Sequence, residues 1–138
     1  MKKTIKSSVL FLLAAVMVFS LVACEKNTSE GSLWDSATHK ENKVVGEGAK
    51  EISVDIEAEG KKITLTVKTD KSTLGEALYE LELINDASFF DVLNGMKADY
   101  SKDKAYWAFY QGETMLPYGV NDAEISGGEH FRFVYTKL

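Results

Sequence analysis

Few of the side chains that commonly carry out catalysis occur in this sequence, and none lies at a spacing typical of a catalytic or metal site. The 138 residues include one cysteine, Cys24, and two histidines, His39 and His130. Neither histidine has a second histidine or a cysteine at the short spacing of a zinc site. A nucleophilic triad would need His130 beside a serine and a carboxylate, and no GxSxG, HExxH, P-loop or GxGxxG motif is present. We therefore expect a protein that is not an enzyme, that holds no metal and that requires no cofactor.

Aromatic side chains, which can stack on a ligand, are concentrated late in the sequence. Eleven of the 15 aromatic residues lie in the last 50 residues. In the expected strand 105–110, Tyr106 and Tyr110 lie on one face and Trp107 and Phe109 on the other. A two-layer domain of this size cannot bury both faces, so one aromatic face is expected to be partly exposed, as in many binding sites. Because strands favour aromatic residues, a purely structural role stays open.

The N-terminus has the layout of a secretory signal peptide. Three lysines occur among the first six residues, and a run from Val9 to Ala23 follows in which Ser20 is the only polar residue. The run is shorter than the about 20 apolar residues that a membrane-spanning helix needs. Residues 1–23 are therefore predicted to direct export and to be removed.

The end of this apolar run carries a short motif. Leu21-Val22-Ala23-Cys24 resembles the lipobox of bacterial lipoproteins. The resemblance implies cleavage before Cys24, attachment to its thiol of a diacylglyceryl group with acyl chains such as palmitate, and anchoring at the extracytoplasmic face of the cell membrane. Two acyl chains suffice for stable anchoring. Two alternatives stay open: a buried thiol after an ordinary signal peptide, and an uncleaved anchor.

The composition of the expected mature chain limits its partners. Removal of residues 1–23 leaves 115 residues, enough for one small domain. The removed segment contains three of the 16 basic residues and none of the 21 acidic ones, so the net charge changes from −5 to about −8. An acidic surface argues against binding to nucleic acid and against electrostatic binding to anionic lipid. We expect a monomer that its lipid, and not its charge, holds to the membrane.

The expected mature chain divides into a tether and a folded domain. Residues 24–50 are polar and charged, contain glycines and show no sustained apolar period, so we predict a flexible tether behind Cys24. Leu33 and Trp34 are isolated apolar residues within this tether and could dock on the domain. Residues 51–138 are predicted to form the folded domain.

The first half of this domain has clear periodic patterns. Alternating apolar residues predict strands at 52–56 and 63–67, which a Glu-Gly turn joins into a β-hairpin. Thr73 and Glu76 form a capping box, and the leucines and alanine that follow make one apolar helical stripe. A helix is therefore predicted directly after the hairpin.

The second half is predicted to be β-rich. A short strand at 89–92 ends at the Asn94-Gly95 turn, and two longer strands cover 105–110 and 130–135. The order of hairpin, helix and short strands predicts an α+β domain in which one helix packs on a mixed sheet. A β-grasp arrangement with aromatic-rich C-terminal strands fits this order best.

Several segments of this domain together resemble one known family, the DUF4430 domain. They are Thr73-Leu74-Gly75-Glu76-Ala77-Leu78, Leu93-Asn94-Gly95-Met96, Tyr106-Trp107-Ala108-Phe109-Tyr110, Gly119-Val120 and Phe131-Arg132-Phe133-Val134-Tyr135-Thr136. This domain is similar to the C-terminal β domain of transcobalamin and intrinsic factor. The resemblance covers residues 51–138 and implies a β-grasp domain that binds a soluble ligand.

The resemblance also implies a ligand site. In transcobalamin-like proteins this domain closes over one face of cobalamin, and a helical domain with no counterpart in this sequence holds the other face. The family's Tyr-Trp pair and the loop that follows it carry over to the implied ligand-binding residues, which are Tyr106, Trp107, Tyr110, Thr114, Leu116, Pro117, Tyr118 and Gly119. Pro117 is displaced relative to the family's Thr-Pro-Leu segment. Cobalamin is thus a possible ligand.

Two functions are compatible with these features. The first is a non-catalytic, membrane-anchored binding lipoprotein that takes cobalamin or a related soluble ligand on its aromatic surface. The second is a surface interaction or adhesion module that recognises a protein partner or a cell-wall polymer. A pocket near Trp107 would favour the first function, and a flat patch would favour the second.

Overall fold

The computed structural model describes residues 31–138, so the predicted signal peptide and Cys24 lie outside the described residues. Within them no helix is long and apolar enough to cross a membrane. The elements in chain order are η1 (Leu33–Ser36), β1 (Lys43–Gly46), β2 (Lys50–Ala58), β3 (Lys61–Thr69), α2 (Leu74–Glu80), β4 (Val92–Leu93), β5 (Met96–Lys97), α3 (Tyr100–Asp103), β6 (Ala105–Gln111), β7 (Thr114–Met115), η2 (Val120–Asp122) and β8 (His130–Lys137).

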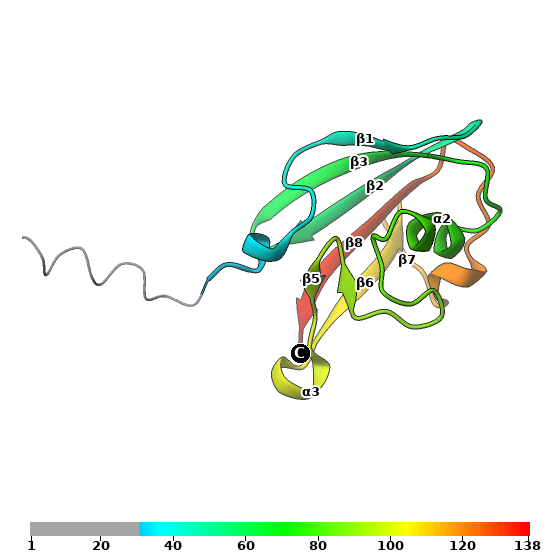
Figure 1. Ribbon diagram of the computed structural model, residues 1–138. Coiled ribbons are helices and arrows are strands. Elements are labelled where there is room, and N and C mark those ends of the chain that lie inside the picture. Colours follow the sequence, from blue (N-terminus) through cyan, green and yellow to red (C-terminus); the bar gives the residue numbers. More distant parts are fainter. Residues whose placement is uncertain (1–30) are drawn as a thin grey trace, which may run out of the picture. The chain divides into compact units, whose positions relative to one another are not determined.

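Six strands form one mixed sheet in the order β1-β3-β2-β8-β6-β7. The last strand, β8, lies between β2, to which it is parallel, and β6, to which it is antiparallel. The edge strand β1 runs parallel to β3, and β4 and β5 form a separate small hairpin. The helix α2 lies on one face of the curved sheet (Figure 1). The predicted α+β class, with a helix on a mixed sheet, is confirmed.

The predicted N-terminal hairpin is formed by β2 and β3, whose pairing runs from Lys50 opposite Thr69 to Ala58 opposite Lys61. Two residues connect the strands, Glu59 and Gly60, and both have a positive φ (50° and 79°). Two-residue loops with positive φ follow the right-handed twist of the flanking strands. The alternating pattern and this turn together determine the register.

The start of α2 has the predicted capping box. The Thr73 hydroxyl accepts a hydrogen bond from the Glu76 amide at 3.2 Å, and the Glu76 carboxylate accepts one from the Thr73 amide at 3.3 Å. Gly75 lies in the first turn, where an added Cβ would collide with Asn121 of η2. A larger residue would displace Asn121, so the glycine allows η2 to pack closely against the helix.

The core lies between the sheet and α2. Every second residue of β2, β3, β6 and β8 points into it, and Phe131 and Phe133 of β8 are fully buried. The Phe109 ring of β6 stacks on Phe133 with 5.0 Å between ring centroids and on Phe131 with 5.8 Å. These three phenylalanines are core residues, as the sequence predicts.

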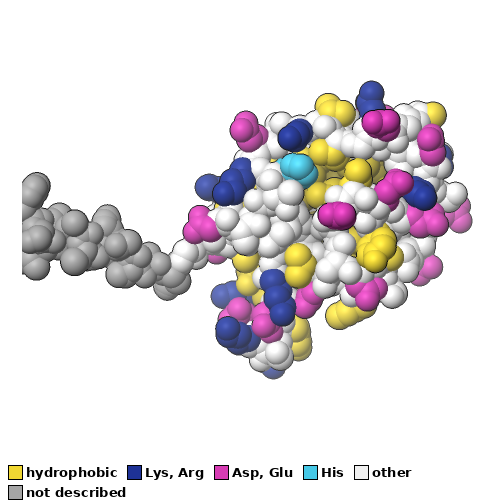
Figure 2. All heavy atoms as spheres, viewed as in Figure 1, with side chains coloured by type: hydrophobic (Ala, Val, Ile, Leu, Met, Phe, Trp, Pro, Cys, Tyr) yellow, Lys and Arg dark blue, Asp and Glu magenta, His cyan; other side chains and the backbone are white. Residues whose placement is uncertain are grey.

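The opposite face of the sheet is polar. Asp55 is buried there, and its carboxylate accepts hydrogen bonds from the Thr64 hydroxyl at 2.7 Å and the His130 ring at 2.9 Å. Burial raises the pKa of Asp55, but these hydrogen bonds outweigh burial and hold the pKa below its usual value. The view of Figure 2, which is that of Figure 1 with α2 in front of the sheet, shows acidic and basic side chains interspersed with hydrophobic ones on that side of the molecule. His130 thus has a structural partner in the sheet.

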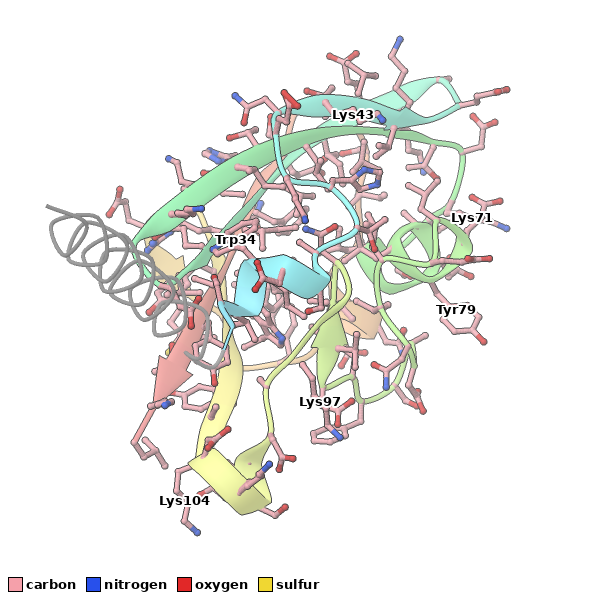
Figure 3. All side chains as sticks on the ribbon, turned by 60° about the vertical axis from the view of Figure 1, so that its left-hand side comes forward. Trp34, Lys43, Lys71, Tyr79, Lys97 and Lys104 are labelled. Carbon is pink, nitrogen blue, oxygen red and sulfur yellow. The ribbon has the colours of Figure 1, made fainter. Side chains whose placement is uncertain are left out.

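The predicted tether is wrong for the part of residues 24–50 that the structure describes. Trp34 of η1 is only 5% exposed and belongs to the core, and its indole N–H donates to the Ala58 carbonyl at 2.8 Å. Further along, β1 adds a parallel strand to β3. Figure 3 shows Trp34 beneath the sheet. The folded domain therefore begins near Leu33, because a single tryptophan and a four-residue edge strand find partners that no local sequence period reveals.

Asn94 connects the N-terminal segment to the rest of the domain. Its side-chain oxygen accepts from the His39 amide and its side-chain nitrogen donates to the His39 carbonyl, both at 2.9 Å. Its backbone accepts from the Thr38 amide at 2.8 Å and donates to the Leu83 carbonyl at 2.7 Å. Asn94 is fully buried and has a φ of 55°, which asparagine tolerates better than most residues.

We predict that Asn94→Ala lowers the free energy of unfolding by about 2–4 kcal/mol, since it leaves two backbone groups of His39 unpaired. The matched control is Asn85→Ala. The Asn85 side chain also donates and accepts hydrogen bonds, but it is exposed, so its loss should cost less than about 1 kcal/mol. Urea unfolding followed by tryptophan fluorescence measures both variants. Equal losses would contradict the role assigned to Asn94.

Candidate functional site

A cavity of about 830 Å³ lies beside β6. Four stretches of chain line it, residues 88–91, 97–101, 105–109 and 115–120. Its volume falls within the range of small-molecule sites, which is about 300–1,000 Å³. The segment between Lys97 and Lys104, both labelled in Figure 3, forms one side of it. The sheet edge and three connecting segments therefore create this hollow.

Aromatic rings that are fixed by the core contribute to the wall of the cavity. Phe109 is held in its stack on β8, and Phe90 packs edge-on against Phe133 at 5.8 Å. Trp107 packs edge-on against Tyr135, with 5.6 Å between the ring centroids. Because these rings are held by strand residues, the wall is preorganised for apolar or stacking contacts.

The rim of the cavity carries aromatic and apolar side chains that lie open to water. Phe89 is 81% exposed, Tyr100 52%, Met115 50% and Tyr118 42%, and all four line the cavity. Complete burial of a large apolar side chain is worth about 1.5–3 kcal/mol. Four such side chains around one hollow form an apolar surface that a ligand would cover.

Aspartate caps order the two rim loops that carry Phe89 and Tyr100. Asp86 accepts from the Ser88 amide at 2.8 Å, from its hydroxyl at 2.9 Å and from the Phe89 amide at 3.3 Å. Asp99 accepts from the Lys102 amide and the Ser101 hydroxyl, both at 3.0 Å. Hydrogen bonds from backbone amides, in first place, lower the pKa of both carboxyl groups below the usual value. Both aromatic rings are therefore displayed by ordered loops.

Six of the eight predicted ligand-binding residues line this cavity. They are Tyr106, Trp107, Leu116, Pro117, Tyr118 and Gly119. Tyr110 and Thr114 do not line it. Tyr110 lies on the polar face of the sheet, where the Arg132 guanidinium lies 4.4 Å from its ring centroid, and Thr114 lies exposed in β7. Tyr106 and Tyr110 form the partly exposed face of β6, whereas Trp107 and Phe109 face the core.

The rim residues Phe89 and Tyr100 were not predicted as site residues from the sequence. Their loops share a local signal, an aspartate followed two residues later by a serine, which occurs at Asp86 and again at Asp99. Aspartates of this kind commonly cap turns. The signal predicts two ordered turns but not that both turns meet at one cavity.

The indole nitrogen of Trp107 has an unusual environment. Trp107 is 8% exposed, and among the described residues its Nε1 is the one buried side-chain nitrogen or oxygen without a hydrogen-bond partner. An unpaired buried donor costs about 1–3 kcal/mol. Trp107 also lines the cavity, so this unpaired donor belongs to a residue of the candidate site.

The two tryptophans provide a matched comparison of stability. We predict that Trp34→Phe costs about 1–2 kcal/mol more than Trp107→Phe, since only the first change removes an indole N–H that donates a hydrogen bond, here to the Ala58 carbonyl. Both changes remove a similar volume from a buried site, so the difference in unfolding free energy isolates the donor. A larger cost for Trp107→Phe would mean that its N–H has a partner in the folded protein.

Comparison with known proteins identifies the fold alone. No protein-family model and no curated protein sequence matches the chain. The chain is similar to the crystal structure of a "putative metal binding protein" from Ruminococcus gnavus ATCC 29149, with a TM-score of 0.60 and 22% identity, over 65% of this chain and 99% of that one. This likeness supports the α+β fold. In the described residues, no three histidine, cysteine, aspartate or glutamate side chains are grouped so as to hold a metal ion.

A second solved structure is more distant. It is haptocorrin in complex with Cbi, with a TM-score of 0.41 and 20% identity over 64% of this chain. The chain spans about a quarter of that protein, 25% of its length.

Proposed function

We propose that this protein binds a soluble ligand in the cavity beside β6, without catalysis, while a lipid on Cys24 anchors it at the extracytoplasmic face of the membrane. The observation that carries the proposal is the combination of an apolar cavity with four exposed apolar side chains on its rim. A cavity next to Trp107 favours this function over the flat contact surface that an adhesion module would use.

Order in the site supports binding over a purely structural role for the aromatic residues. Phe89 contributes little to the core, since it is 81% exposed, yet Asp86 caps the turn that carries it. A loop that is ordered around an exposed aromatic ring has already lost the conformational entropy that binding would otherwise cost. The ligand would therefore meet a preformed rim.

Cobalamin is the first ligand to test, because the DUF4430 resemblance implies it. The Tyr106-Trp107 pair of that resemblance lies on β6 at the cavity. The family assignment itself stays a prediction, since it depends on short segments of sequence.

We predict that Phe89→Ala and Tyr118→Ala each weaken ligand binding about tenfold, because each removes apolar contact worth roughly 1–2 kcal/mol. Cobalamin, measured by titration calorimetry, and anilinonaphthalene sulfonate, measured by its fluorescence, are the two probes. The stability of both variants should stay close to that of the unchanged protein, because both side chains are exposed.

Tyr79→Ala is the control for the rim variants. Tyr79 is 54% exposed but extends from α2, outside the lining of this cavity (Figure 3). It should leave the affinity for either probe unchanged. Binding that weakens equally in all three variants, or in none of them, would place the ligand elsewhere and contradict the proposal.

The anchor has a separate test. In a bacterial host, labelled palmitate should be incorporated into the unchanged protein, and Cys24→Ser should abolish both the label and sedimentation with membranes. Because Cys24 is the only cysteine of the chain, no other thiol can carry the lipid. Label that persists in the variant, or an unchanged protein that takes up no label, would refute the anchor.

A further inference from the structure

The cavity runs along the edge of β6, and not only across one face of the sheet. Its lining includes every residue from Ala105 to Phe109. Successive strand residues point to opposite faces, so a hollow that touches all five lies beside the strand, where backbone groups are directed.

The hydrogen bonds between β6 and β8 show which backbone groups of β6 face this edge. The Gly112 amide donates to the His130 carbonyl at 2.9 Å, and the Leu138 amide donates to the Lys104 carbonyl at 3.1 Å. Both residues of each pair have even numbers, and both pairs extend the register between β6 and β8. In an antiparallel pair, hydrogen-bonded residues alternate with residues whose N–H and C=O point the other way. Odd-numbered residues of β6 therefore direct their backbone groups away from β8.

The chain itself uses the two ends of this edge. At one end the Leu116 amide donates to the Phe109 carbonyl at 2.9 Å, beside the pairing with β7. At the other end the Ala105 amide donates weakly to the Asp99 carbonyl at 3.4 Å. The groups between them have no hydrogen-bond partner among the described residues: the Ala105 carbonyl, the Trp107 amide and carbonyl, and the Phe109 amide. All three residues are at most 8% exposed, so unpaired groups are costly there.

The edge stays open because the chain leaves it after β7. If the β7 register continued, residue 118 would lie opposite Trp107. Pro117 and Gly119 lead instead into η2, which packs against α2. The unpaired edge beside Trp107 therefore lies where β7 would continue if the chain did not turn away.

The geometry points to an extended peptide segment as the ligand of this site, added as a short strand beside Trp107. This inference rests on the proposed function and names its ligand class. An extended backbone supplies an N–H and a C=O at the spacing of the open edge, and its side chains alternate, so that one row reaches the aromatic wall of the cavity. The exposed rings of Phe89 and Tyr118 would cover the added strand on its outer side.

The test selects ligands from a random heptapeptide library with the purified protein and then methylates each backbone nitrogen of a selected peptide in turn. Added-strand binding predicts that affinity falls roughly tenfold at alternate positions only, because every second amide of the peptide pairs with β6. On binding, the Trp107 amide should become protected from hydrogen exchange. The Ala108 amide serves as the internal control, since it already bonds to β8 in the free protein.

The outcomes separate this inference from the proposed function. Peptides that bind without the alternating pattern, or without protection of the Trp107 amide, overturn the added strand and leave the cavity as a site. The same holds if cobalamin or anilinonaphthalene sulfonate binds with the predicted dependence on Phe89 while no heptapeptide is selected. If neither probe nor any peptide binds, both proposals fail.

Discussion

The insertion of β8 between β2 and β6 is the constraint on which the rest of the structure depends. This last strand is parallel to one neighbour and antiparallel to the other, so it joins the N-terminal hairpin to the aromatic second half. Its buried Phe131 and Phe133 also form the surface on which Phe109 stacks. The pairing of β8 with β6 also determines which residues of β6 bond to β8, and therefore which backbone groups of β6 face the cavity. Core and candidate site therefore share one set of interactions.

Around this frame, the cavity is built from segments that contribute little to the core. The loops at Asp86 and Asp99 are ordered by local carboxylate–amide hydrogen bonds, while the rings they carry remain in water. Local caps can hold a loop without burying its tip, and so leave apolar surface available for contact. An ordered and exposed aromatic rim, next to an unpaired indole N–H, is easier to explain by binding than by folding.

Much of the fold could be predicted because its signals are local. Alternation across 52–67, the Glu59-Gly60 turn and the Thr73 capping box each act within a few residues, and all three occur in the structure as predicted. The tether prediction was wrong for the opposite reason, because that segment is held by contacts between residues far apart in the sequence. Trp34 is buried by contact with Ala58, and His39 is held by Asn94, 55 residues away. Contacts at such separations leave no period in a single sequence.

By itself, the sequence determined the N-terminal hairpin, the helix after it, the aromatic strand and six of the eight residues that were expected at a ligand site and do line one cavity. Only the tertiary structure decided that Trp107 faces the core side while Tyr110 faces Arg132, because the register against β8 assigns each residue to a face. It also decided that Phe89 and Tyr100 meet at one rim. The alternation of a strand specifies two faces, but only packing specifies which of them is covered.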